Sequence, residues 1–116
     1  MIVAVQGSKN FDDYSVFMRA MSVALSHLPK DDTKFYIYSA GPAKINAMVS
    51  EFSNLSERGM KARGRKIKFF KIPPSWIKEN FESVGYFAFL STPQDPNSAM
   101  VAEAELHNVE VGIFKY

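Results

Sequence analysis

The sequence has no cysteine and only two histidines, which lie far apart. Without cysteine there is no disulfide, no thiol nucleophile and no thiolate ligand for a metal. Two isolated histidines do not complete the ligand set of a structural zinc site, so we expect no metal. No apolar run approaches the about 20 residues that a membrane-spanning helix needs, and the N-terminus lacks the basic and apolar segments of a signal peptide. We therefore expect a cytoplasmic protein that does not bind membranes.

Length and composition indicate one globular domain. The chain has 116 residues, of which 47% are hydrophobic and 22% are charged, close to the averages of globular proteins. These values exclude wholesale disorder and a collagen-like structure. No internal repeat, low-complexity tract or linker divides the chain, so we expect a single domain over residues 1–116.

Basic residues are concentrated in one segment, although the net charge is only +2. Segment 58–71 (RGMKARGRKIKFFK) contains no acid, so the rest of the chain has an excess of negative charge. Its basic residues are Arg58, Lys61, Arg63, Arg65, Lys66, Lys68 and Lys71. The segment predicts either an anion-binding patch or a solvated loop followed by an amphipathic strand.

Short β-rich runs alternate with helical stretches along the chain. Apolar and β-branched runs bounded by turn residues predict strands at 2–6, 34–39, 66–72, 84–90 and 109–114. Apolar residues three and four positions apart predict helices at 11–28, from 42 to near 58, at 75–82 and at 99–107.

Local chemistry predicts several details of these helices. Asp12 and Asp13 suit the first turn of helix 11–28, where the helix dipole favours negative charge. Met18 lies on the apolar stripe that this helix is expected to bury. Pro42 suits a first-turn position, which needs no backbone N–H. Asn108 suits a left-handed cap after the last helix.

Strands that alternate with helices predict an α/β fold. We expect a Rossmann-like three-layer sandwich with a five-stranded, mainly parallel sheet in the order 3-2-1-4-5. The run 84–90 is the most apolar and lacks alternation, which predicts a central strand beside 2–6. The strand order reverses between these two strands, and ligands of such folds bind outside the carboxyl ends of the strands at that switch point.

Three loops follow strands near the predicted switch point, at 6–11, 39–42 and 91–98. Free N–H groups at helix starts attract phosphate, and glycines would let the backbone approach a phosphate closely. The residues expected to bind a ligand are Gly7, Ser8, Lys9, Ser39, Gly41, Thr92, Asp95 and Ser98. The alternative is that they are ordinary turn and capping residues.

The opening VQGSKNFDDYSVFMRAM resembles the start of small Rossmann-like proteins of the SLOG superfamily, in particular its compact YpsA-related branch. That branch begins with a strand, Gly-Ser-Arg, an aromatic-Asp stretch and a helix. The residues at matching places are Val5, Gly7, Ser8, Lys9, Phe11 and Tyr14, with Lys9 where arginine is usual. The branch next has a Gly-Gly-Ala-Arg-Gly-Ala-Asp turn, of which only Gly41 is clearly kept.

The third matching loop bears on activity. In phosphoribohydrolase members of the superfamily it reads Pro-Gly-Gly-x-Gly-Thr-x-x-Glu, and segment 93–101 (PQDPNSAMV) aligns with it without gaps. Gln94, Asp95 and Asn97 replace the glycines, and Val101 replaces the glutamate. Because hydrolysis needs that carboxylate, the resemblance implies a module that binds a nucleotide or phospho-ligand without catalysis or cofactor.

Three functions stay open. The first is binding of a nucleotide or nucleotide-derived ligand at the three loops. The second is protein interaction or assembly, with a decayed pocket. The third is single-stranded nucleic-acid binding, with bases stacked on aromatic residues beside a basic track. Its residues would be Arg58, Lys61, Arg63, Arg65, Lys66, Lys68 and Trp76.

Two further expectations concern packing and assembly. Trp76 follows two prolines and either stacks on a base or packs a short helix onto the sheet. Aromatic residues make up 14% of this small chain, and the helix faces are rich in methionine. Such apolar surface can exceed what one core covers, so we expect a homo-oligomer.

Overall fold

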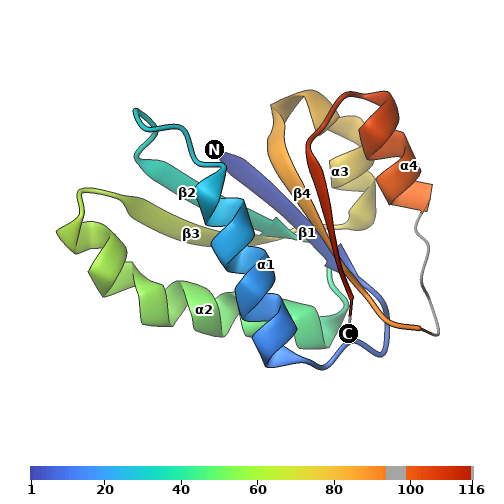
Figure 1. The fold of residues 1–116 in the computed structure, drawn as a ribbon, viewed down its shortest axis with the longest axis horizontal. Coiled ribbons are helices and arrows are strands. Elements are labelled where there is room, and N and C mark those ends of the chain that lie inside the picture. The colour runs from blue at the N-terminus through green and yellow to red at the C-terminus, as the bar shows by residue number, and fades with distance from the viewer. Residues whose placement is uncertain (94–98, 116) are drawn as a thin grey trace.

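The computed structural model describes residues 1–93 and 99–115 (Figure 1). Strands and helices alternate along the chain as the sequence predicts. The elements are β1 (Ile2–Gly7), α1 (Tyr14–Ser26), β2 (Lys34–Ser39), α2 (Ala43–Ala62), β3 (Lys66–Lys71), α3 (Pro74–Glu79), a 3-10 turn η1 (Phe81–Ser83), β4 (Val84–Ser91), α4 (Ala99–Leu106) and β5 (Val111–Lys115).

The strands form one sheet in the order β3-β2-β1-β4-β5. Each neighbouring pair is parallel, so the predicted Rossmann-like α/β fold is confirmed, with a wholly parallel sheet. Val3 of β1 pairs with Ile37 of β2 on one side and with Tyr86 of β4 on the other. The central position of β4 beside β1 is therefore also confirmed, and β3 and β5 form the two edges.

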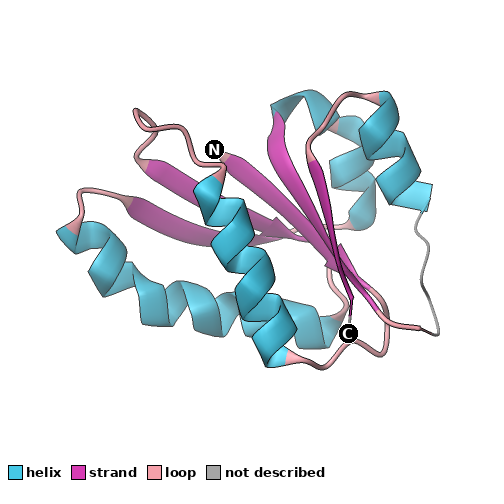
Figure 2. Ribbon diagram, in the orientation of Figure 1, coloured by secondary structure: helices cyan, strands magenta, loops and turns pink. Residues whose placement is uncertain are grey.

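Helices α1 and α2 cover one face of the sheet and create the larger core (Figures 1 and 2). Phe17 of α1 and Ile45 of α2 are fully buried there against Val3 and Val5. Among the described residues, no helix is long and apolar enough to cross a membrane.

The opposite face is covered only in part. Its smaller core joins α3 and α4 to β1, β4 and β5, through residues such as Ile77, Phe87 and Met100. No residue of β2 or β3, both of which the structure describes in full, belongs to this core. In Figure 2, α3 and α4 gather beside β4 and β5, whereas β2 and β3 extend beyond them. On that face β2 and β3 are contacted by a helix at Tyr38, where Trp76 of α3 stacks, and contribute nothing to the smaller core.

Helix α1 is shorter than predicted, because Asp13 is its N-cap. The Asp13 carboxylate accepts a hydrogen bond from the Val16 N–H at 3.0 Å, so the helix begins at Tyr14. The aspartates therefore precede the first turn instead of lying in it. Met18, predicted to be buried, is 36% exposed, since the buried stripe of α1 runs through Phe17 and Met21.

Helix α2 is longer than predicted. Pro42 is its N-cap, not a first-turn residue, and the helix continues through Gly59 to Ala62 instead of ending near Arg58. Good helix formers after the glycine outweigh its cost of about 1 kcal/mol. The turn after the helix contains Gly64 at a φ of +71°, a conformation that glycine adopts readily.

The remaining differences lie at element ends. The predicted helix 75–82 is divided at Asn80, whose side-chain amide donates to the Trp76 carbonyl at 2.8 Å, into α3 and η1. Strand β5 begins at Val111 and not at 109. Asn108 has a φ of 59°, which confirms the predicted left-handed residue after α4.

Candidate functional site

The first candidate site is the switch point, where the loops after β1, β2 and β4 meet. The Gly7 N–H donates to the Gly41 carbonyl at 3.1 Å, and the Ser8 N–H donates to the Leu90 carbonyl at 2.8 Å. The Thr92 N–H donates to the Ser8 hydroxyl at 3.2 Å. The structure thus brings Gly7, Ser8, Gly41 and Thr92 together, but the N–H groups of Gly7, Ser8 and Thr92 already donate to carbonyl and hydroxyl oxygens of the protein.

Gly7 does not leave the space that a phosphate was expected to use. A Cβ built on Gly7 would lie 2.1 Å from Ile45 Cδ1 and 2.9 Å from the Leu90 carbonyl oxygen. The glycine is required because a side chain of α2 and the backbone of β4 approach it closely. A larger residue at this position would disturb packing before it could block a ligand.

Ser39 and Gly41 also have internal partners. Ser39 is buried, and its hydroxyl donates to Asn46 Oδ1 at 2.5 Å and accepts from the Gly41 N–H at 3.5 Å. Gly41 has a φ of +89°, so glycine suits this turn. Both residues therefore serve the β2–α2 turn, which is the alternative that the sequence left open.

The helix start beside the switch point carries negative charge. Asp13 caps α1, and the Asp12 carboxylate lies 3.3 Å from Lys44 Nζ. These two carboxylates lie at the N-terminus of α1, the positive end of the helix dipole. A phosphate bound at this helix start would need the same place. Lys9 is exposed.

Other predicted residues of the third loop divide into two groups. Asp95 and Ser98 lie outside the described residues. Val101 of α4, at the place of the hydrolase glutamate, is buried in the smaller core. Thr92 is 3% exposed, and its hydroxyl has no hydrogen-bond partner among the residues that the structure describes. Buried polar groups without a hydrogen-bond partner are rare. The Thr92 hydroxyl is therefore a group at the switch point that can still form a hydrogen bond.

The second candidate site is the side of β2 and β3 that faces away from the larger core. Tyr36, Tyr38, Phe70 and Trp76 lie there half-buried, and we call these four residues the aromatic face. The ring centroids of Tyr38 and Trp76 are 4.6 Å apart in a stacked arrangement. Phe70 lies 4.8 Å from Tyr38 and 5.8 Å from Tyr36. The four rings form a continuous run from α3 across β2 and β3.

Strand register explains why lysines accompany these rings. Residues two apart in a strand point to the same face. Phe35, Ile37 and Ile67 face the larger core, and the residues between them face outward. The outward pairs of β2 and β3 are Lys34 with Lys66, Tyr36 with Lys68, and Tyr38 with Phe70.

A hollow of about 470 Å³ opens at the amino-terminal ends of β2 and β3. We call it the basic hollow, because five basic residues and a single acid, Glu57, line it. The basic residues are Lys34, Lys61, Arg65, Lys66 and Lys68. None of these five forms an ion pair with any described residue. The hollow is therefore a concentration of uncompensated positive charge next to the aromatic face.

The predicted basic segment is only partly gathered here. Lys61, Arg65, Lys66 and Lys68 line the hollow, whereas Arg58 and Arg63 do not. Lys34, Tyr36 and Tyr38, which come from β2, were not predicted as site residues from the sequence. Their signal was the alternation of KFYIYS, which is typical of a strand with one face not covered by the core.

Comparison with known proteins finds no matching family model, curated protein or solved structure. The resemblance to the SLOG superfamily and the nucleotide binding that it implies therefore stay predictions. Within the described ranges 1–93 and 99–115, no group of three or more histidine, aspartate or glutamate residues is arranged to hold a metal ion.

Proposed function

We propose that the protein binds single-stranded nucleic acid across the aromatic face, with phosphates at the basic hollow. The observation that carries this proposal is the run of four aromatic rings beside Lys66 and Lys68, three of them on strands β2 and β3 and the fourth on α3 at the edge of the smaller core. Bases stack on such rings whatever their sequence, and each stacked base contributes about 1–3 kcal/mol.

The charge pattern favours a nucleic acid over a protein partner. An apolar protein surface would leave the unpaired lysines of the hollow without partners, whereas each phosphate pairs with one and releases counterions. The ring pattern favours a single strand over a duplex. Bases in a duplex stack on one another, whereas single strands offer unstacked bases to aromatic side chains.

Trp76 supplies the assay. It is the single tryptophan of the chain and part of the aromatic face, so its fluorescence reports directly on a base stacked there. We expect a short oligothymidylate to quench this fluorescence saturably, with an affinity that falls as salt rises. Absence of saturable quenching, or equal affinity for duplex DNA, would contradict the proposal.

A matched pair of double variants tests the location. Lys66→Gln with Lys68→Gln should lower the salt-dependence slope by about 1.4, since each phosphate contact on a single strand contributes about 0.7. Arg58→Gln with Lys71→Gln removes the same charge from exposed residues outside the hollow and should leave the slope nearly unchanged. Equal losses in both variants would show unspecific attraction and contradict the location.

A second candidate function is binding of a nucleotide-derived ligand at the switch point, favoured by the unpaired Thr92 hydroxyl. Thr92→Val tests it without removing bulk. If a ligand uses the hydroxyl, the variant loses mononucleotide binding. If none does, both proteins bind mononucleotides equally or not at all, which contradicts this function, and removal of the unpaired group leaves stability unchanged or raised.

A further inference from the structure

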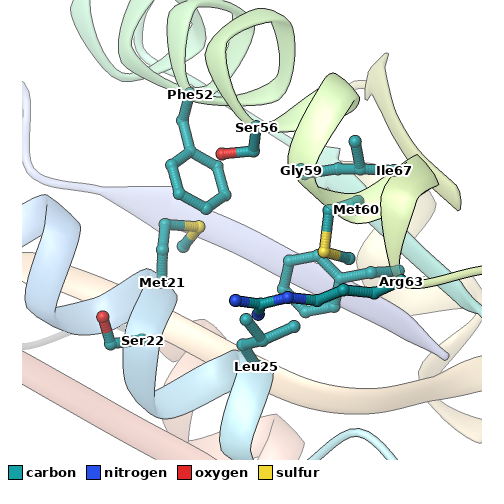
Figure 3. A pocket seen from close by; sticks show the side chains of 10 residues that line it. Met21, Ser22, Leu25, Phe52, Ser56, Gly59, Met60, Arg63 and Ile67 are labelled. Carbon is teal, nitrogen blue, oxygen red and sulfur yellow. The ribbon is translucent and has the colours of Figure 1, made fainter. Parts of the chain in front are cut away.

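A separate cavity of about 260 Å³ lies between α1 and α2, on the sheet face opposite the aromatic face (Figure 3). The nucleic-acid proposal does not use it. Its walls are mainly apolar, from Met21, Leu25, Phe35, Phe52, Met60 and Ile67. In Figure 3, Phe52 and Met21 face one another across it. The cavity is therefore suited to an apolar group.

One charged side chain and two hydroxyls complete the lining. Arg63, the C-cap of α2, extends toward Leu25 of α1, and Ser22 and Ser56 lie on the two helices (Figure 3). Arg63 forms no ion pair with any residue that the structure describes. A guanidinium binds a carboxylate through two parallel hydrogen bonds, so this end of the cavity is complementary to an acid.

Gly59 supports the cavity in a second way. It lies inside α2, where glycine weakens a helix relative to alanine. A Cβ built on it would meet nothing within 4 Å, and it is not among the glycines with positive φ. Neither backbone conformation nor close packing therefore requires this glycine. Gly59 is exposed and lines the cavity, so the space beside it is open.

We propose that this cavity binds a small apolar monocarboxylic acid, with its chain between α1 and α2 and its carboxylate on Arg63. Pockets for drug-sized ligands measure roughly 300–1,000 Å³, so a cavity of about 260 Å³ suits a smaller molecule. Ser22 of α1 and Ser56 of α2 each add a hydroxyl to the lining.

The probes are hexanoate, octanoate, decanoate and the uncharged octanol. Each CH₂ that becomes buried should strengthen binding about four-fold until the chain outgrows the cavity. Methyl NMR signals of Met21 and Met60, which line the cavity, should shift on titration. Because Arg63 is exposed, Arg63→Gln should weaken octanoate binding up to about five-fold and leave octanol binding unchanged.

Two variants at Gly59 test the site without disturbing the fold. Gly59→Leu adds a large side chain to the lining without breaking the helix and should weaken octanoate binding, whereas Gly59→Ala should retain it. Absence of saturable octanoate binding, or equal binding to Gly59→Leu, would overturn the proposal. Equal affinity for octanoate and octanol would overturn the role of Arg63. Lys66→Gln with Lys68→Gln should leave octanoate binding unchanged, which separates this site from the nucleic-acid interface.

Discussion

Replacing Tyr38 by leucine removes the central ring of the aromatic face. Tyr38 contacts Trp76 at 4.6 Å and Phe70 at 4.8 Å between centroids, so no other residue of the face touches two rings as closely. Loss of two aromatic pairs should reduce the free energy of unfolding by roughly 1–3 kcal/mol. Loss of one stacked base should weaken oligothymidylate binding about 5- to 150-fold.

Both quantities can be measured on the same samples. Urea unfolding gives the stability, and Trp76 quenching by oligothymidylate gives the affinity. Tyr14→Leu is the matched control, because Tyr14 is also half-buried and stacks on Phe17 at 5.6 Å, but on the other side of the sheet. It should lose stability and keep its affinity. Unchanged affinity in a folded Tyr38→Leu protein would refute stacking on this face.

Three more predictions concern the fold and its assembly. Gly59→Ala should raise the free energy of unfolding by about 1 kcal/mol in urea titrations, because its Cβ meets open space in a helix. Hydrogen bonds from the Val16 N–H and the Ser15 hydroxyl lower the pKa of Asp13 below its usual 3.8. Its stabilising effect is therefore complete above that value and lost as the pH falls through the lower folded pKa. Melting temperatures should thus decline less on acidification in Asp13→Asn, which keeps a neutral cap, and parallel declines would contradict this. Light scattering should show a homo-oligomer, and a 13.1 kDa species would count against it.

The fold could be predicted because its signals are local. Strand β2 has the predicted bounds 34–39, since a polar loop precedes it and Gly41 and Pro42 follow it. The apolar run at 84–90 indicated a central strand because both of its faces are covered. Helix ends were less accurate, because the cap at Asp13 and the continuation through Gly59 depend on small free-energy differences.

The candidate sites depend on contacts between distant residues, and these could be predicted only in part. The hydroxyls and glycines of the switch point were found, but not the Ile45 side chain that fills the space at Gly7. The basic segment was found, but not its partners Tyr36 and Tyr38, which parallel pairing brings beside it. Sequence spacing does not reveal which half of a sheet face contributes nothing to a core.

The lysines of β3 also bear on how the protein avoids aggregation. Strand β3 is an edge of the sheet, so its outer backbone N–H and C=O groups are open to pairing with a strand of another molecule. Lys66, Lys68 and Lys71 are exposed along this six-residue strand, and charges on an edge oppose such pairing. A bound polyanion would neutralise these charges, but it would also cover the strand. Loss of these charges without a ligand would leave the edge free to extend the sheet from one molecule to the next.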